Sequence, residues 1–296
     1  MSKASIIVSY DGESLKNHTM DIRELSISLT GLADIFQEAN LVLNKGQATT
    51  SIQVKAFKEG SFQIHFDVIQ SGINFLGIFD NSTITGALNL AQILGFSGGV
   101  TGLFKFIKFL KGKGIKDKSI IDDKLKITNY FGDSLIINNN VYNLYQNTAI
   151  RKGFEKAVEP VLTEGIDVLE IFEETKNGSE KIDSINKSDA EYFVFSEQEN
   201  KINEYESEMY LNLISPSFED GNKWRFSTGS GKFYATIKDE NFLNEINSGI
   251  KLFGKKDILK ARVLVKQNET GDFQIKNEYE ILEVIEHKRN DQLGLF

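Results

Sequence analysis

The sequence has no cysteine, only three histidines and only two prolines in 296 residues. The lack of cysteine excludes disulfides, thiolate metal sites and a cysteine nucleophile. None of the histidines (His18, His65 and His287) stands in a spacing that binds zinc. The sequence also lacks a phosphate-binding glycine loop before a helix. We therefore expect a non-enzymatic protein without a metal or a cofactor.

The charge is acidic in total but unevenly distributed. There are 34 Lys and Arg against 42 Asp and Glu, a formal net charge of -8, which disfavours non-specific binding of the whole chain to nucleic acid. Residues 72–126 contain eight lysines against four aspartates, whereas residues 151–208 contain seven basic and sixteen acidic side chains. These opposite charges predict either two solvated surfaces or surfaces that dock on another molecule.

The composition is that of a folded chain of more than one unit. Hydrophobic residues make up 40% and charged residues 26%, and a chain of 296 residues exceeds the usual size of a single core. The 22 phenylalanines, against one tryptophan, predict cores and interfaces built on phenylalanine. The first ten residues lack the apolar core of a signal peptide. We expect a cytoplasmic location, with membrane association on activation as an alternative.

The hydrophobic pattern predicts an α+β fold that begins with a β-α-β-β unit over residues 1–70. Residues 4–10 are rich in β-branched side chains and predict a strand. Apolar residues at spacings of three and four predict a helix over residues 21–43, in which Gly31 is the one weak point. Strict alternation over residues 51–57 and 61–68 predicts a hairpin with one buried side.

The middle of the chain predicts a mixed α/β unit followed by a linker. Within residues 119–175 we expect two short strands, two helices and a further strand, in that order. Residues 176–200 are polar and charged with almost no apolar periodicity, which is typical of a linker or mobile loop.

Residues 201–296 predict a small antiparallel β-barrel-like unit with one helix. Three strands, a helix and two strands follow one another, the order of an OB-type barrel. Such a unit makes nucleic-acid binding an alternative function, for which aromatic and basic side chains are present: Trp224, Arg225, Phe226, Lys232, Phe233 and Tyr234. Alternating aromatics are equally what a barrel core needs, and the acidic total makes a nucleic-acid partner the weaker expectation.

The most distinctive segment is residues 81–104, which contain no charged side chain and five glycines. Its length is sufficient to cross a bilayer, but Asn89, Gln92 and the glycines make it too polar for an ordinary spanning helix. Gly98 and Gly99 predict a break between two helices, over residues 84–94 and 100–110. We therefore expect residues 71–118 to form a glycine-rich helical hairpin with a lysine-rich tail.

The second helix of this hairpin is the candidate contact site for a protein partner or a membrane. Its lysines lie three residues apart on one face and apolar side chains occupy most of the rest. The candidate residues are Leu103, Phe104, Lys105, Phe106, Ile107, Lys108, Phe109 and Lys111. Three interpretations remain open: a buried core hairpin with lysines at its edge, a surface for self-association or a protein partner, and insertion of residues 84–111 into a membrane.

Residues 88–99 with 105–113, and residues 137–142 with 150–152, resemble a family of uncharacterised bacterial and phage-borne proteins. The resemblance supplies no catalytic residues, and it implies a role in phage–host conflict, as defence or anti-defence. Our leading hypothesis is a non-enzymatic protein that assembles with itself, as a homo-oligomer, or with a protein partner. Membrane insertion and nucleic-acid binding through the C-terminal unit are the alternatives.

Overall fold

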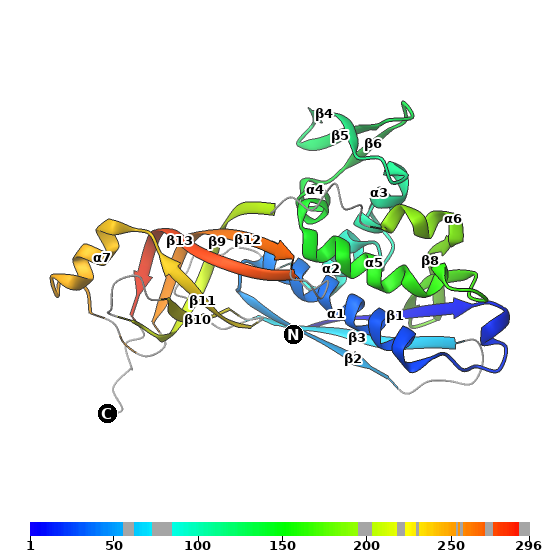
Figure 1. The fold of residues 1–296 in the computed structure, drawn as a ribbon, viewed down its shortest axis with the longest axis horizontal. Coiled ribbons are helices and arrows are strands. Elements are labelled where there is room, and N and C mark those ends of the chain that lie inside the picture. The colour runs from blue at the N-terminus through cyan, green and yellow to red at the C-terminus, as the bar shows by residue number, and fades with distance from the viewer. Residues whose placement is uncertain are drawn as a thin grey trace. The chain divides into compact units, whose positions relative to one another are not determined.

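The computed structural model describes residues 1–55, 62–72, 85–194, 203–217, 223–228, 231–252, 254, 257–269 and 275–289 (Figure 1). The fold is α+β, as the hydrophobic pattern predicts. The chain divides into two compact units, each of which is described by itself. Unit 1 consists of Met1–Ala39, Thr50–Ser71 and Thr85–Glu199, and unit 2 of Asn40–Thr49, Gly72–Ile84 and Asn200–Phe296.

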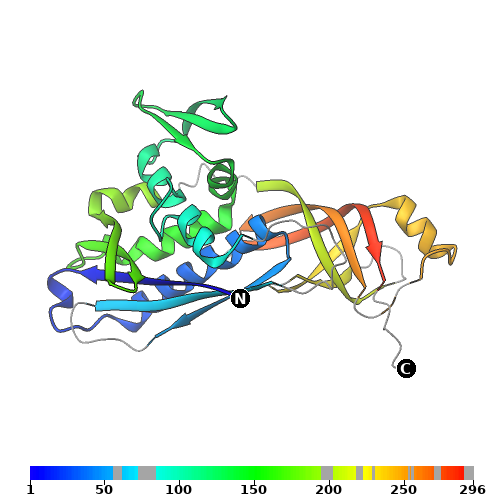
Figure 2. The same ribbon diagram turned by 180° about the vertical axis from the view of Figure 1, so that it is seen from behind.

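Unit 1 is built around a five-stranded sheet with the strand order β2-β3-β1-β7-β8. The strands are β1 (Ser2–Asp11), β2 (Ala48–Val54), β3 (Phe62–Gly72), β7 (Val168–Thr175) and β8 (Gly178–Asn186). The helical elements are η1 (Glu13–Leu15), α1 (Ile22–Asn44), α2 (Ala87–Leu94), α3 (Leu103–Leu110), α4 (Asn139–Gln146), α5 (Thr148–Leu162), α6 (Lys187–Ala190) and η2 (Glu191–Phe193). Helices α1 and α5 lie along one face of the sheet (Figure 1). Figure 2 shows the same arrangement from behind.

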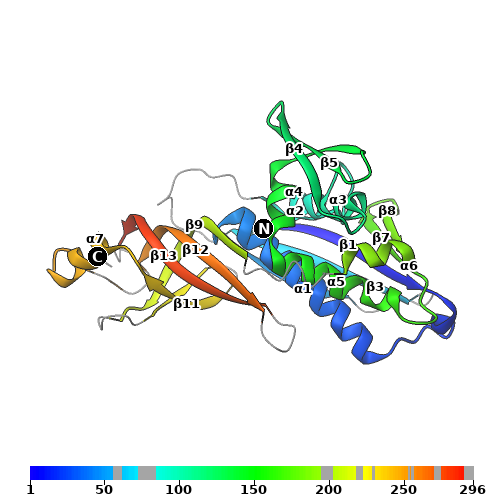
Figure 3. The ribbon, with the colours of Figure 1, turned by 45° about the horizontal axis from the view of Figure 1, so that its top comes forward.

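A second, three-stranded sheet belongs to unit 1, with the order β4-β5-β6. Its strands are β4 (Ile115–Ile121), β5 (Lys124–Asn129) and β6 (Ser134–Ile137). It projects beyond α3 and α4 in all three ribbon views (Figures 1 to 3). We call β4, β5, β6 and their two turns, residues 115–137, the projecting sheet. The sequence pattern predicts β5 and β6 but not β4, because six of the seven side chains of β4 are exposed and carry no alternation.

The predicted linker over residues 176–200 is wrong for residues 178–193. Strand β8 pairs with β7 from Val168↔Asn186 to Thr175↔Gly178, and α6 and η2 follow it. Strand β8 lies at the edge of the sheet and most of its side chains are exposed, so its sequence does not need apolar alternation. Residues 195–200 lie outside the described residues.

Phenylalanine builds the core of unit 1. The ring of Phe96 lies 5.1 Å from that of Phe36, 6.1 Å from that of Phe104 and 6.0 Å from that of Phe154, centroid to centroid. Phe104 also contacts Phe193, at 5.1 Å. These rings come from α1, the α2–α3 connection, α3, α5 and η2, so the cluster joins segments that are far apart in the sequence.

Helices α1 and α5 approach most closely where two glycines meet. A Cβ atom on Gly31 would lie 2.5 Å from the carbonyl oxygen of Gly153, and one on Gly153 would lie 2.7 Å from a side-chain carbon of Ile35. Gly31 therefore weakens α1 as an isolated helix but lets α1 pack against α5.

We expect Gly31→Ala to destabilise the protein by about 1–3 kcal/mol, because the added methyl group overlaps the backbone of α5. Helix propensity alone predicts the opposite sign, a gain of about 1 kcal/mol. Urea denaturation measures the difference. The neighbouring Thr30→Ala, on the exposed face of α1, is the matched control and should change stability by no more than about 0.5 kcal/mol. A stabilised Gly31→Ala would contradict the close approach.

Unit 2 contains a closed barrel with the order β10-β11-β13-β12-β9 (Figure 3). Its elements are β9 (Asn203–Ser215), β10 (Trp224–Ser227), β11 (Lys232–Ile237), α7 (Glu240–Asn247), β12 (Ile258–Glu269) and β13 (Ile275–Lys288). Strands β11 and β13 are parallel, whereas the other strand pairs among the described residues of the barrel are antiparallel. This topology, with the helix between the third and fourth strands, is that of an OB-type barrel, as the element order predicts.

Inward-pointing side chains of every strand fill the barrel, and Phe242 of α7 joins them. Trp224 and Phe226 of β10 are buried there, so the alternation of aromatic residues in this strand reflects packing in the barrel core. On the outside, basic residues of β12 pair with glutamates of its neighbours: Lys260 with Glu208, Arg262 with Glu206 and Glu283, and Lys266 with Glu204 and Glu280.

Candidate interaction surface

The glycine-rich segment forms the predicted helical hairpin. Helix α2 ends at Gly95, which adopts the left-handed conformation with φ 95°, and α3 begins after Gly102. A Cβ atom on Gly102 would lie 2.5 Å from the Cα atom of Gly95, so the two glycines touch where the chain turns. Only glycine permits this approach, and the turn places Phe96 and Phe104 in the phenylalanine cluster.

Most of the candidate contact residues on α3 lie in the core of unit 1. Leu103, Phe104, Phe106 and Ile107 are buried, and Phe109 is half-buried. The hydrophobicity of the segment is thus accounted for by packing inside the unit. Among the helices of the described residues, none is both long and apolar enough to cross a membrane.

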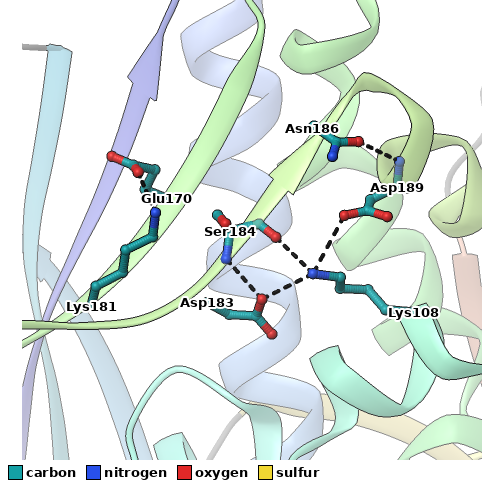
Figure 4. Close-up of polar contacts among 7 residues, drawn as sticks. All are labelled: Lys108, Glu170, Lys181, Asp183, Ser184, Asn186 and Asp189. Carbon is teal, nitrogen blue, oxygen red and sulfur yellow. Dashed lines mark hydrogen bonds and ion pairs between the residues drawn. The ribbon is translucent and has the colours of Figure 1, made fainter.

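The three lysines of the candidate site have different surroundings. Lys105 and Lys111 are exposed, whereas Lys108 is largely covered. The ammonium group of Lys108 lies 3.0 Å from a carboxylate oxygen of Asp183 and 3.4 Å from one of Asp189, and it donates a 2.8 Å hydrogen bond to the carbonyl of Ser184 (Figure 4). Lys108 therefore attaches α3 to β8 and α6, and it is a structural residue of unit 1.

We expect Lys108→Met to destabilise the protein by about 1–3 kcal/mol, because two partly buried carboxylates would lose their shared cation. The methionine keeps most of the aliphatic stem, so the change removes charge and hydrogen bonds with little change of volume. Lys105→Met, on the same helix but exposed, is the control and should be nearly neutral in the same urea titration. Equal stabilities of the two variants would show that the network contributes nothing.

The exposed lysines gather on the projecting sheet and the adjoining end of α3. From residue 101 to residue 154 the sequence contains no glutamate, and eight lysines lie between residues 105 and 126. Among the described residues, six of these lysines have no carboxylate within ion-pair distance: Lys105, Lys113, Lys116, Lys118, Lys124 and Lys126. Four aspartates, Asp117, Asp122, Asp123 and Asp133, equal the lysines of the projecting sheet in number, so the local excess of positive charge comes from the adjoining end of α3.

Apolar side chains are exposed at both ends of the projecting sheet. At the β4–β5 end, Ile120 is 78% exposed and Ile136 is 50% exposed, with Ile121 beside them. At the β5–β6 turn, Tyr130 is 61% and Phe131 57% exposed. Strand β5 separates the two groups, and its six residues span about 20 Å. The exposed apolar side chains thus form two groups that stand apart along the sheet.

Three cation–π contacts order this surface. The ammonium group of Lys111 lies 4.9 Å from the ring centroid of Phe131, and that of Lys118 lies 4.4 Å from the ring of Tyr142. The guanidinium group of Arg151 lies 4.7 Å from the ring of Tyr145. Tyr145 and Arg151 also line a pocket at the end of α3. Pairs of this type restrict exposed side chains before any partner binds.

A second, smaller basic surface lies on the OB-type barrel. Arg225 and Tyr234 point outward from directly opposed positions of β10 and β11, and the guanidinium group lies 5.6 Å from the tyrosine ring. Tyr234 is 56% exposed, and Lys232 is exposed on the same strand. β10 and β11 are the second and third strands of the barrel, the strands on which OB folds bind oligonucleotides and oligosaccharides.

Two further polar clusters have structural explanations. Desolvation alone would raise the pKa of Asp67, but hydrogen bonds from Lys3, Ser5 and Lys55 outweigh it and hold that pKa below its usual value. A hydrogen bond from Lys55 to Glu174 raises the pKa of the lysine, so this cluster ties several strands of the five-stranded sheet together.

His287 and Asp257 form a buried 2.9 Å contact inside unit 2. Asp257 also accepts a 2.7 Å hydrogen bond from the backbone N–H of Gly254, which fixes the chain just before β12. Within the part of the chain that the structure describes, no three His, Asp or Glu side chains are placed to hold a metal ion. The expectations of no metal, no cofactor and no enzymatic activity stay predictions.

Comparison with protein-family models, with curated proteins and with solved structures gives no match. The resemblance of residues 88–99 and 105–113 to uncharacterised bacterial and phage-borne proteins therefore stays a prediction. The sequence pattern did not predict a contact site on the projecting sheet. The signal that points to it is the lysine-rich, glutamate-free composition around β4, which the sequence analysis assigned to a tail of the helical hairpin.

Proposed function

We propose that this chain is a non-catalytic protein-binding protein and that its contact surface is the projecting sheet with the adjoining end of α3. The observation that carries the proposal is the combination of exposed isoleucines and aromatics with unpaired lysines on one projecting element. Apolar side chains supply the binding energy of such a surface, and the lysines select an acidic partner.

Charge favours a different protein over a second copy of this chain. Several acidic side chains that face β8 and the outside of the barrel already have cations of their own: Lys108 and Lys181 in unit 1, and Lys260, Arg262 and Lys266 in unit 2. A second copy would have to break these pairs to offer those carboxylates to the lysines of the projecting sheet. A different protein with free carboxylates could neutralise these lysines without breaking any ion pair.

Two observations favour a protein over a membrane. The apolar residues of α3 are held inside the core, so insertion of residues 84–111 requires unit 1 to open. The exposed apolar groups of the projecting sheet stand at its two ends, which suits an elongated contact better than the insertion of one tip. A role in phage–host conflict rests on the resemblance alone and stays a prediction.

We expect Ile120→Asp to abolish or weaken partner binding at least about tenfold, because the most exposed apolar side chain of the projecting sheet becomes a charge that repels an acidic surface. Ile250→Asp is the matched control, since Ile250 is exposed to a similar degree, 77% against 78%, but belongs to unit 2. Proteins retained by the wild-type chain and the control, but not by Ile120→Asp, would each be purified and titrated alone.

The proposal requires one purified acidic protein whose affinity falls with Ile120→Asp, is unchanged in Ile250→Asp and weakens as salt is raised. Equal binding to all three chains would overturn it. Two further arms test the other occupants. A concentration-dependent mass that Ile120→Asp reduces would identify a second copy as the occupant, and co-sedimentation with phosphatidylserine-containing vesicles, without any protein partner, would identify a membrane surface.

A second candidate function, binding of single-stranded nucleic acid, rests on the outward Arg225–Tyr234 pair of the OB-type barrel. An exposed ring beside a guanidinium group and a lysine is the arrangement on which bases stack. Trp224 and Phe226, two of the aromatics that the sequence offers for this role, are buried in the barrel core and cannot serve it.

If the barrel binds oligonucleotides, Tyr234→Ala should weaken binding of a fluorescent oligo-dT about tenfold at low salt, because one stacking contact is lost. Arg225→Gln should both weaken binding and reduce its salt dependence. Arg262→Gln is the control, because Arg262 lies on β12 and contacts Glu283 at 3.0 Å. No measurable anisotropy change with the wild-type chain at low salt would remove this candidate.

A further inference from the structure

Strand β4 is an edge strand that the described residues leave open on one side. It is the first strand in the order β4-β5-β6 and pairs with β5 alone, from Ile115↔Asn129 to Ile121↔Lys124. Six of its seven residues are exposed. Alternate N–H and C=O groups of β4 therefore point away from β5, toward solvent, in the arrangement that accepts an additional strand.

The edge is protected only in part. The register shifts between Ile115 and Asp117, so a bulge at Lys116 interrupts the start of the strand. From Asp117 to Ile121 the pairing with β5 is regular, which leaves five residues with straight edge geometry. Edge lysines and bulges are the usual means by which proteins prevent uncontrolled strand pairing.

The charges of β4 oppose pairing with a second copy of itself. A two-fold axis normal to the sheet sets one residue opposite its own counterpart, and full pairing of the seven residues places Lys118 opposite Lys118. A shift of one residue toward the N-terminus sets Asp117 opposite Asp117. A shift the other way sets Lys118 opposite Ile120. Each register thus places like charges together or a charge against an apolar side chain.

The regular part of β4 favours a neighbouring strand with one carboxylate and one aliphatic residue. Lys118 and Ile120 share one face of this part, and Asp117, Ser119 and Ile121 share the other, where Ser119 and Ile121 pair with Lys126 and Lys124 of β5. A neighbouring strand with a carboxylate opposite Lys118 and an aliphatic residue opposite Ile120 would pair the charge and cover the isoleucine.

We infer that an extended acidic segment of the partner adds to the free edge of β4 as a fourth strand of the projecting sheet. This inference rests on the proposed protein-binding function and specifies its mode, in which main-chain hydrogen bonds supply affinity and the lysines supply selectivity. The added strand would bury part of the exposed isoleucine side chains at the β4–β5 end.

The test uses the full chain and three short synthetic peptides. The first has a glutamate opposite Lys118, a valine opposite Ile120 and threonine at the other positions. The second has the same sequence with the edge-facing amides N-methylated, and the third replaces the glutamate by lysine. The first should bind, and amide hydrogen exchange should slow in β4 but not in β13. The N-methylated peptide should bind about tenfold more weakly, the effect of losing one to two hydrogen bonds with side chains and charge unchanged.

Lys118→Glu, tested beside Lys232→Glu as a charge-matched control in unit 2, should weaken only the glutamate peptide. Equal binding of the methylated and unmethylated peptides, equal binding of the lysine peptide, no change in the exchange of β4 amides, or no peptide binding at all would each overturn the inference. A purified protein partner that depends on Ile120 would still stand in any of these cases, so failure of the strand-addition mode is distinguishable from failure of the proposed function.

Discussion

The contact between Gly95 and Gly102 is the constraint on which unit 1 depends. It turns the chain between α2 and α3 within a space that no larger residue fits, and it places Phe96 and Phe104 together against Phe36 and Phe154. The contact between Gly31 and Gly153 likewise lets α1 and α5 approach more closely than larger residues would permit. Gly31 and Gly153 weaken their helices in isolation, and the close packing that they permit offsets that loss, whereas Gly95 adopts the left-handed conformation that glycine favours.

Once α3 is held in the core, its lysines acquire different roles. Lys108 is turned toward β8 and α6 and is neutralised by Asp183 and Asp189, whereas Lys105 and Lys111 remain in solvent. Exposed lysines thus lie at the end of the helix and on the strands that follow it. Solvent reaches the side chains of β4 and not the apolar face of α3.

Strand β4 shows why this surface differs from an ordinary solvated one. A strand with six exposed residues and a free edge is stable because β5 pairs with it, and β5 in turn packs its buried Leu125 and Ile127 inward. Exposed edges are a hazard that lysines reduce. In full pairing of β4 with a second copy, Lys118 would lie opposite Lys118, so this register is disfavoured by charge.

The sequence by itself determined the α+β class, the hairpin break at Gly98 and Gly99, the long helix and the OB-type element order, because buried elements impose a period of 3.6 or 2 on apolar residues. It did not reveal β4 or β8, since exposed edge strands need no such pattern. Only the tertiary structure decided which apolar residues are covered, because burial depends on neighbours distant in sequence. That decision moved the candidate site from the buried face of α3 to the projecting sheet.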